Sequence, residues 1–379
     1  MSPEYTHMKL SLGLNVLRSI ATLLIVVHHA NSDIIPDLPN TSGAAGFILW
    51  RIRNLGWSGI DLFFVLGGFF MGAGVFTDIH KMGRVRLTHY WKRRATRIIP
   101  SYYFLLLVLA VTGATGFIEF TTPFSTVRSI LTHFLFLNNY LDQLPNGPTW
   151  FLAAMVQFYT LVPLCLSYLN SVRYIPVLDN FLKIAVALIV LDLAFRVARV
   201  ASGTHLPNDF MLSHFRFDTI FIGMLTMYLY RNRHPFVARI TAHPWVSFGF
   251  SFLLIAPAMF FPRTNPFMFT VGFTLLAFGY AGIILLVADG ALKLTGRALV
   301  PLAVFSGWSY NVYLWHYFLP SLLGKPYVNL QLLIHSMTDS RNLMILVQIL
   351  SFVILSILVG YLATILVERP AARLISKRS

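Results

Sequence analysis

Charged side chains are scarce in this sequence. Only 11% of its 379 residues are charged and 56% are hydrophobic, whereas soluble domains carry roughly 25% charged residues. A single soluble core cannot absorb this much apolar sequence, so the composition excludes an ordinary soluble protein and indicates an integral membrane protein. Cysteine is scarcer still, because Cys165 is the only one. One cysteine excludes an intramolecular disulfide and a thiol-based metal cluster, and we predict no metal site.

Long apolar runs fill most of the chain. A helix needs about 18 or more mostly apolar residues to cross a bilayer, and windows of this kind predict about ten spans. The fold predicted is an all-α bundle of transmembrane helices in a single polytopic domain, residues 1–379, with no fused soluble domain. The first run is expected to be an uncleaved span, not a removed signal peptide. The expected spans are 12–30, 56–76, 99–118, 149–169, 181–201, 212–230, 245–261, 267–288, 300–324 and 343–367.

Two of these spans are less secure than the others. Asp192, Arg196 and Arg199 interrupt the span predicted at 181–201, and Arg216 and Asp218 interrupt the next one. Asp192 and Arg196 are four residues apart on one predicted helix, so they are expected to pair.

Basic residues are concentrated in alternate loops. With a cytoplasmic N-terminus, nineteen Lys and Arg fall in inner segments and six in outer loops. This bias is the membrane orientation signal and places both termini in the cytoplasm. It also accounts for the formal charge of +15 without a nucleic-acid partner, and we predict none.

A polar stripe runs along the first span. Arg18 and His29 are eleven residues apart, so at ~100° per residue they return to within ~20° of one direction, ~16 Å apart along the helix axis. Ser11, Asn15 and Thr22 fall on the same face. Ionisable groups inside a membrane are costly and mark functional sites by default. The stripe therefore predicts a buried reaction path with Arg18 toward the cytoplasm and His29 at the outer end.

Five stretches together resemble the membrane-bound acyltransferase-3 family, whose members transfer acyl groups, often to sugars of bacterial surface glycans. They are Arg18-x10-His29; Trp57-Ser-Gly-Ile-Asp61-Leu-Phe-Phe-Val-Leu-Gly-Gly68-Phe; Arg94-x-x-Arg97-Ile-Ile-Pro100; Ser309-Tyr-Asn-Val-Tyr-Leu-Trp-His316; and Glu368-Arg-Pro370. Each stretch alone is weak evidence, but five in order over nearly the whole chain are specific.

The sequence departs from the family pattern at two places. The family often has W-S-L-x-x-E-x-x-F-Y in mid-chain, whereas Trp150 here leads to Met155 at the position of the acid, followed by Phe158 and Tyr159. Gly67 replaces the usual Ser before Gly68. The missing acid keeps open a catalytically inert relative that serves a glycan-export complex.

The resemblance implies a membrane O-acyltransferase, most simply an O-acetyltransferase. Its donor would be acetyl-CoA or another acyl-CoA, with no permanently bound cofactor. Its acceptor would be a hydroxyl of a carbohydrate or lipid-linked glycan, such as a lipopolysaccharide O-antigen or an exopolysaccharide. Membrane lipids surround it, and the location implied is the bacterial inner membrane, which the chain crosses many times.

The titratable residues divide among donor, base and acceptor roles. Acyl transfer to a hydroxyl needs a base, and histidine titrates near working pH, so His29 is the predicted general base, with Asp61 orienting it. Arg18, Arg94 and Arg97 are predicted to bind the phosphates of the donor. The residues predicted at the acceptor are Trp150, Tyr159, Arg216 and His316.

Simpler roles exist for several of these residues. His29 would otherwise cap its helix, Arg18 would reach the inner interface, and Arg94 and Arg97 would act as orientation anchors. His316 is expected first as a polar contact inside the bundle and second as a site residue. The same intramembrane charges also suit a transporter of a glycan or an organic anion, although the paired broken helices of transport repeats are not evident.

Overall fold

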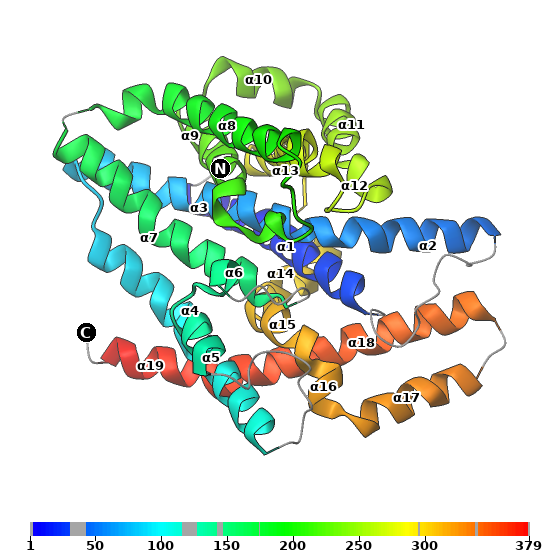
Figure 1. The fold of residues 1–379 in the computed structure, drawn as a ribbon. Coiled ribbons are helices and arrows are strands. Elements are labelled where there is room, and N and C mark those ends of the chain that lie inside the picture. The colour runs from blue at the N-terminus through cyan, green and yellow to red at the C-terminus, as the bar shows by residue number, and fades with distance from the viewer. Residues whose placement is uncertain are drawn as a thin grey trace. The chain divides into compact units, whose positions relative to one another are not determined.

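A computed structural model describes residues 3–30, 43–115, 127–141, 147–173, 175–294, 296–337 and 340–377. Within these ranges the regular secondary structure is helical and no strand is present (Figure 1). The all-α prediction is therefore confirmed. Ser11 of the polar stripe lies outside the residues whose side chains are described.

Six helical segments of the described chain are long and apolar enough to cross a membrane. They lie at Leu12–His29, Gly46–Met82, Leu87–Ala114, Thr149–Ser171, Met268–Ala288 and Asn342–Ile375. A seventh span exists if Pro235–Ala242 and Pro244–Phe260, which are bent by 98°, count as one. These seven segments overlap seven of the ten spans predicted from the sequence.

The structure does not confirm the other three predicted spans. Helix α8 (Val177–Ala201) is long enough but carries too many charges, and α9 (Phe217–Arg231) has only 15 residues. The segment predicted at 300–324 is broken into short helices, with Pro301 and Pro320 near their starts. The count of ten spans and the location of the termini therefore stay predictions.

The chain forms two compact units, each described here by itself. Unit 1 comprises residues 1–19, 60–95 and 150–306, and unit 2 comprises residues 20–59, 96–149 and 307–379. Helices α1 (Pro3–His29), α3 (Gly59–Met82) and α4 (Leu87–Ala114) contribute residues to both.

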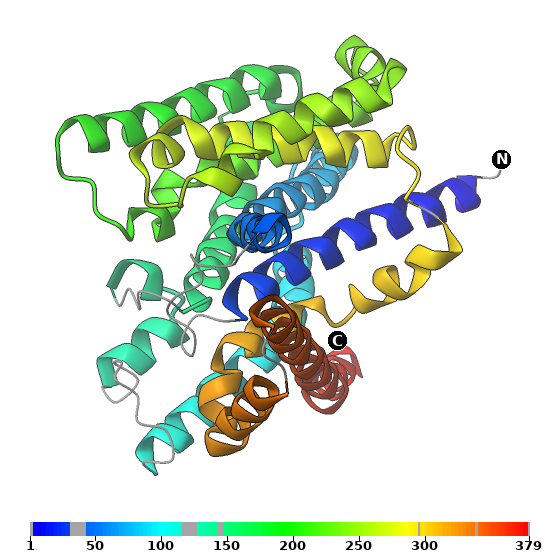
Figure 2. The same cartoon turned by 90° about the vertical axis from the view of Figure 1, so that its right-hand side faces the viewer.

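Unit 1 is built around helix α13. Residues Phe273–Ala288 of α13 pack against α9 and α11, and α8 packs against α9; Figure 2 shows α13 in yellow beside the yellow-green α11. The remaining elements of unit 1 are α7 (Thr149–Ser171), η4 (Asp209–Met211), η5 (Ser213–Phe215), α10 (Pro235–Ala242), α11 (Pro244–Ile255), α12 (Pro257–Phe260), the π-helix η6 (Met268–Gly272), η7 (Arg297–Leu299) and α14 (Val300–Phe305).

Two glycines allow α3 and α9 to touch backbone to backbone. A Cβ atom on Gly68 would collide with the Ile220 carbonyl oxygen, and one on Gly223 would collide with the Val65 carbonyl oxygen. A side chain at either position would push the helices apart, so this close approach requires glycine.

Unit 2 packs α15 (Ser309–Trp315) against α18 (Arg341–Ala363), which also contacts α17 (Lys325–Ser336). Figure 1 shows α17 and α18 running side by side. Its other elements are α2 (Gly43–Leu55), η2 (Gly56–Ser58), α5 (Val127–Phe134), α6 (Asn138–Leu141), η8 (His316–Phe318), α16 (Leu319–Leu323), the π-helix η9 (Thr364–Glu368) and α19 (Arg369–Lys377).

Candidate functional site

Two histidines from opposite ends of the sequence meet in unit 2. His29 is the last residue of α1 and His316 is the first residue of η8. The His316 Nε2 and His29 Nδ1 atoms are 3.2 Å apart. His316 is fully buried, whereas His29 is partly exposed. The structure thus brings together the predicted base and one of the predicted acceptor residues.

Backbone carbonyls determine which nitrogens of the pair carry hydrogen. The His316 Nδ1 atom lies 2.6 Å from the Tyr313 carbonyl oxygen, and the His29 Nδ1 atom lies 2.9 Å from the Ile25 carbonyl oxygen. A carbonyl accepts only, so Nδ1 of each ring is the donor. Neutral His316 then has a lone pair on Nε2 that accepts from His29 Nδ1. The remaining nitrogen of neutral His29, Nε2, carries a lone pair and has the electronic state of a general base.

The rings of Tyr317 and His28 contact the partly exposed ring of His29, the predicted base. The ring of Tyr317 meets the His29 ring at 90° with centroids 5.6 Å apart, and the His28 ring lies edge-on to it at 5.1 Å. The His28 Nδ1 atom is 3.2 Å from the Arg53 carbonyl oxygen at the end of α2. His28 thus contacts backbone through Nδ1, as His29 does, and the role of His29 as the base stays a prediction.

A second polar cluster of unit 2 is centred on Asn311 of α15, the helix that ends just before His316. The Asn311 side chain donates to Glu368 Oε2 at 2.6 Å and to Thr364 Oγ1 at 2.9 Å. Both acceptors belong to the π-helix η9, a type of turn that is frequent at functional sites. Arg97, which is exposed, lies within electrostatic reach of Glu368. Asn311 stands five positions before His316 in the chain, which is about 7.5 Å at the helical rise of 1.5 Å per residue.

Arg94 belongs to unit 1 and lies in an aromatic cradle. Its guanidinium carbon is 4.4 Å from the centre of the Tyr159 ring and 5.5 Å from that of Tyr90. The Trp91 indole donates to the Tyr159 carbonyl at 3.1 Å. Tyr159, predicted at the acceptor, is therefore a neighbour of a predicted donor-binding arginine. A guanidinium group that lies on aromatic rings can also offer N–H donors to a phosphate.

Arg18 and Trp150 occupy other parts of unit 1. The Arg18 guanidinium lies 5.3 Å from the centre of the Phe70 ring and is half-buried. Trp150 is buried in an aromatic cluster with Phe64 and Phe210. It stands nine residues from Tyr159 on α7, roughly 14 Å along the axis, and the acceptor role of the two residues stays a prediction.

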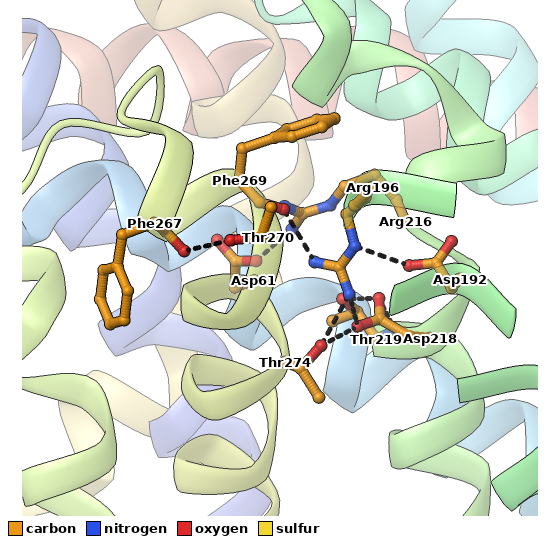
Figure 3. Close-up of polar contacts among 10 residues, drawn as sticks. All are labelled: Asp61, Asp192, Arg196, Arg216, Asp218, Thr219, Phe267, Phe269, Thr270 and Thr274. Atoms are coloured by element: carbon orange, nitrogen blue, oxygen red, sulfur yellow. Dashed lines mark hydrogen bonds and ion pairs between the residues drawn. The ribbon is translucent and has the colours of Figure 1, made fainter. Parts of the chain in front are cut away.

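Five charged side chains form a fully buried network in unit 1 (Figure 3). Arg216 pairs with Asp61. Arg196 pairs with Asp192 at 3.1 Å and with Asp218 at 2.5 Å, which confirms the predicted pairing four residues apart. Thr274 hydrogen-bonds to both Arg196 and Asp218. The network thus connects α3, α8, α9 and α13, with Arg216 standing just before the first residue of α9.

Two of the predicted site residues, Arg216 and Asp61, belong to this buried network. Arg216 is 1% exposed and lies over the Phe273 ring at 4.0 Å. Its buried partner Asp61 is 2% exposed. Such burial is typical of a structural ion pair. The predicted roles of Asp61 in orienting His29 and of Arg216 at the acceptor stay predictions.

The chain also matches a known family over most of its length. An acyltransferase domain model of the acyltransferase-3 family covers residues 11–365. The chain belongs to the acyltransferase-3 family. It is 25% identical over 359 residues to the O-acetyltransferase OatA of Staphylococcus aureus (strain NCTC 8325), covering 87% of this chain and 53% of that protein. It is 24% identical over 347 residues to a protein of strain MSSA476 provisionally named an O-acetyltransferase, covering 87% and 54%. The chain thus spans about half the length of these relatives, and no solved structure matches it.

The polar clusters of unit 2 are built from residues of the family stretches. His29, Arg97, Asn311 with His316, and Glu368 come from four of the five family stretches, and all lie in unit 2. Asn311 and Glu368 received no role from the sequence, although both stand inside quoted stretches. The sequence could have pointed to these two residues, because an amide and a carboxylate within apolar helices need hydrogen-bond partners.

The two departures from the acyltransferase-3 pattern contact each other. A Cβ atom on Gly67 would lie 2.5 Å from the Met155 Cε atom and 3.4 Å from the Tyr159 hydroxyl. Met155 thus fills the space that a side chain at position 67 would take. The two departures are therefore neighbours in space, next to Tyr159.

Proposed function

We propose that this protein is a membrane O-acyltransferase, most simply an O-acetyltransferase. It moves an acyl group from cytoplasmic acetyl-CoA, or another acyl-CoA, to a carbohydrate hydroxyl such as one on a lipopolysaccharide O-antigen or an exopolysaccharide. Its place is the bacterial inner membrane, as a multi-pass protein among membrane lipids. One observation carries the proposal: the His29 Nδ1 atom lies 2.9 Å from the Ile25 carbonyl oxygen and 3.2 Å from Nε2 of the buried His316, so two acceptors hold the ring of the proposed base in place.

His29 acts first as base and then as acid. Its Nε2 takes the hydroxyl proton while the hydroxyl oxygen attacks the thioester carbonyl carbon. The tetrahedral intermediate collapses with cleavage of the carbon–sulfur bond, and the proton passes from Nε2 to the leaving sulfur. The imidazolium that forms in between keeps donating from Nδ1 to the Ile25 carbonyl and to His316. These acceptors stabilise its charge, which lowers the barrier.

Three arginines serve the donor. Arg94 and Arg97 belong to the basic segment at 81–97, which the charge bias assigns to the cytoplasmic side. Their guanidinium groups suit the phosphates of acyl-CoA, and Arg18 extends this positive charge along the first span. Trp150 and Tyr159 stay candidate acceptor contacts, and Tyr159 also borders Arg94.

Transfer of label tests the proposal directly. Purified protein in lipid is given labelled acetyl-CoA and candidate glycans, and acetylated product is measured for wild type and His29→Ala. The proposal expects product from the wild type and a loss of about 10²- to 10⁴-fold in the variant. Movement of unmodified glycan across vesicles by both proteins, without acetylated product, would favour a transporter instead.

The donor site has its own measurement. Simultaneous charge reversal of Arg18, Arg94 and Arg97 should abolish acetyl-CoA binding, because the phosphates would meet repulsion in place of attraction. Donor affinity unchanged by the triple reversal would remove these residues from the donor site.

A further inference from the structure

The buried network of unit 1 contains one more acid than it has bases. Its acids are Asp61, Asp192 and Asp218, and its bases are Arg196 and Arg216. All five side chains are at most 2% exposed. If every group were ionised, three negative charges against two positive ones would leave a net charge of −1 away from solvent. An uncompensated buried charge is costly, and a group in such a place is neutralised by a proton instead.

Asp218 is the carboxylate that neutralises Arg196. One of its oxygens accepts from Arg196 Nη2 at 2.5 Å and from the Thr274 hydroxyl at 2.7 Å (Figure 3). Its other oxygen accepts from the backbone N–H of Thr219 at 2.6 Å and from the hydroxyl of the same residue at 3.0 Å. Donors on both oxygens favour the ionised form of a carboxyl group. Asp218 therefore carries a negative charge.

Asp192 lacks donors of this kind. Both of its carboxyl oxygens are buried, and neither has a hydrogen-bond partner among the described residues. Arg196 Nε approaches one of them to 3.1 Å, but that nitrogen is likewise without a hydrogen bond within the described chain, so the two side chains are only close in space. A carboxylate this deep needs hydrogen bonds as well as a nearby cation. Asp192 is therefore the acid of the network least suited to a negative charge.

The charged groups around Asp192 come from its own helix α8 and from the neighbouring α9. They are Arg196 on α8, Asp218 on α9, and Arg216 just before α9. The other elements that pack most closely against α8 are η6, which has no titratable side chain, and η5, whose His214 lies within electrostatic reach of the separate pair formed by Arg199 and Asp209. Asp218 is a like charge, and of two neighbouring carboxyl groups one keeps its proton. The donors on Asp218 place that proton on Asp192.

We propose that Asp192 holds a proton in the folded protein, which makes the five-residue network electrically neutral and lets α8 pack on α9 through an uncharged carboxyl group. This protonation site belongs to unit 1 and does not depend on the proposed acyl transfer. It makes the packing of α8 sensitive to pH, because loss of the proton in alkaline solution leaves a buried negative charge without a partner.

A metal ion would balance the charge less well than a proton does. Ca²⁺ and Mg²⁺ take about six or more oxygen ligands, whereas Asp192 offers two oxygens and has the positive Arg196 Nε 3.1 Å from one of them. Within the described ranges, no group of three or more His, Cys, Asp or Glu side chains could hold a metal ion. A proton needs a single oxygen, so it is the occupant that the site fits.

Infrared spectroscopy tests the protonated carboxyl group directly. The full chain in lipid nanodiscs, with aspartate labelled by ¹³C at its carboxyl carbon, is measured at neutral pH, where a protonated carboxylic acid absorbs apart from ionised carboxylates. We expect a protonated band that carries the label in the wild type, its loss in Asp192→Asn, and its retention in Asp209→Asn. Asp209 is the matched control because it is also buried beside an arginine, but accepts hydrogen bonds from Arg199 and the Leu206 N–H.

Unfolding in mild detergent gives an independent measurement. An amide has nearly the shape of a protonated carboxyl group and no charge, so Asp192→Asn should change the unfolding equilibrium constant at neutral pH by no more than a few-fold. Asp218→Asn removes the counter-charge of Arg196 and should raise that constant by about 10²-fold or more. The wild type takes up a proton at Asp192 when it folds above about pH 4, where unfolded aspartic acid is ionised. Its unfolding constant relative to Asp192→Asn should therefore rise with pH, by up to about tenfold per unit.

Three results would overturn the protonation site. The first is a wild-type spectrum without the labelled band of a protonated carboxyl group. The second is an unfolding constant, relative to Asp192→Asn, that does not vary with pH. The third is stabilisation by sodium ions that Asp192→Asn abolishes, since a metal ion would then supply the missing positive charge. If Asp192→Asn does not fold, Asp192→Glu decides, because it should remove the labelled band while keeping a carboxyl group at this position.

Discussion

His316 accepts a hydrogen bond from His29: the Nε2 atom of the one lies 3.2 Å from the Nδ1 atom of the other. The bond joins the end of the first predicted span to a short 3-10 turn 287 residues later in the chain. His316 is itself fixed by the Tyr313 carbonyl. The Ile25 carbonyl and the buried His316 ring together hold Nδ1 of the partly exposed His29 as a donor.

The hydrogen-bond acceptor at His316 should matter more than its ring. His316→Leu removes the acceptor, so we expect kcat to fall about 10- to 100-fold with KM nearly unchanged, since the loss acts on the transition state. His316→Gln offers an amide oxygen and should recover part of the rate. Equal kcat values for the Leu and Gln variants would show that His316 serves packing alone.

The buried pair of Asp61 and Arg216 should be costly to break from one side. Arg216→Met leaves a buried carboxylate without its cation, and we expect a loss of about 3–5 kcal/mol in the free energy of unfolding. The double variant Asp61→Leu/Arg216→Met removes both charges and should cost less than the sum of the single losses. Unfolding in lipid or mild detergent measures this, and strict additivity would contradict a coupled pair.

The close packing of α3 on α9 can be tested by substituting three glycines of α3, Gly67, Gly68 and Gly74, and comparing the stability of the variants. Gly68→Ala puts a methyl group against the Ile220 backbone and should destabilise the fold by about 1–3 kcal/mol or more. In Gly74→Ala the new atom would lie 3.9 Å from the Tyr90 ring, an ordinary contact, so this variant is the control. Gly67→Ser meets the flexible end of Met155 and should fall between them. Melting temperatures that rank Gly74→Ala below Gly68→Ala would refute the packing.

Asp209, which lies outside the candidate spans, should give a pH dependence of stability. Burial raises the pKa of its carboxyl, but hydrogen bonds from Arg199, the Leu206 N–H and His205 outweigh burial and hold the pKa below its usual value. A carboxyl with a depressed folded-state pKa contributes stability above its unfolded pKa of about 3.9, and loses it as pH falls through the folded value.

The measurement for Asp209 compares unfolding of wild type and Asp209→Asn between neutral and acidic pH. The wild type should be more stable near neutrality, and the gap should close below about pH 4. A gap that is constant over the whole range would show that the carboxylate charge does not contribute.

The sequence predicted the helices, and it named His29 as the base, but it did not show that His29 contacts His316. Ten spans were expected from the length of the apolar runs, and the structure has candidate spans at seven of them. These seven were predictable because a helix that crosses a membrane needs a continuous apolar run. The spans predicted around Arg196 and Arg216 are not confirmed, and the sequence could not show that these arginines pair with acids from other helices. The contact of His29 with His316 depends on tertiary packing, as does the link between Gly67 and Met155, and local patterns carry no such information.

The central claim is that His29 is the base, and the most direct test is the rate of transfer from labelled acetyl-CoA in a matched pair of variants. His28 is the natural control, because it is adjacent to His29 and its Nδ1 faces the Arg53 carbonyl. We predict that His29→Asn loses about 10²- to 10⁴-fold in kcat, while His28→Asn, equally well folded, keeps kcat within a few-fold of wild type. Full activity in His29→Asn, or equal losses in both variants, would contradict the account.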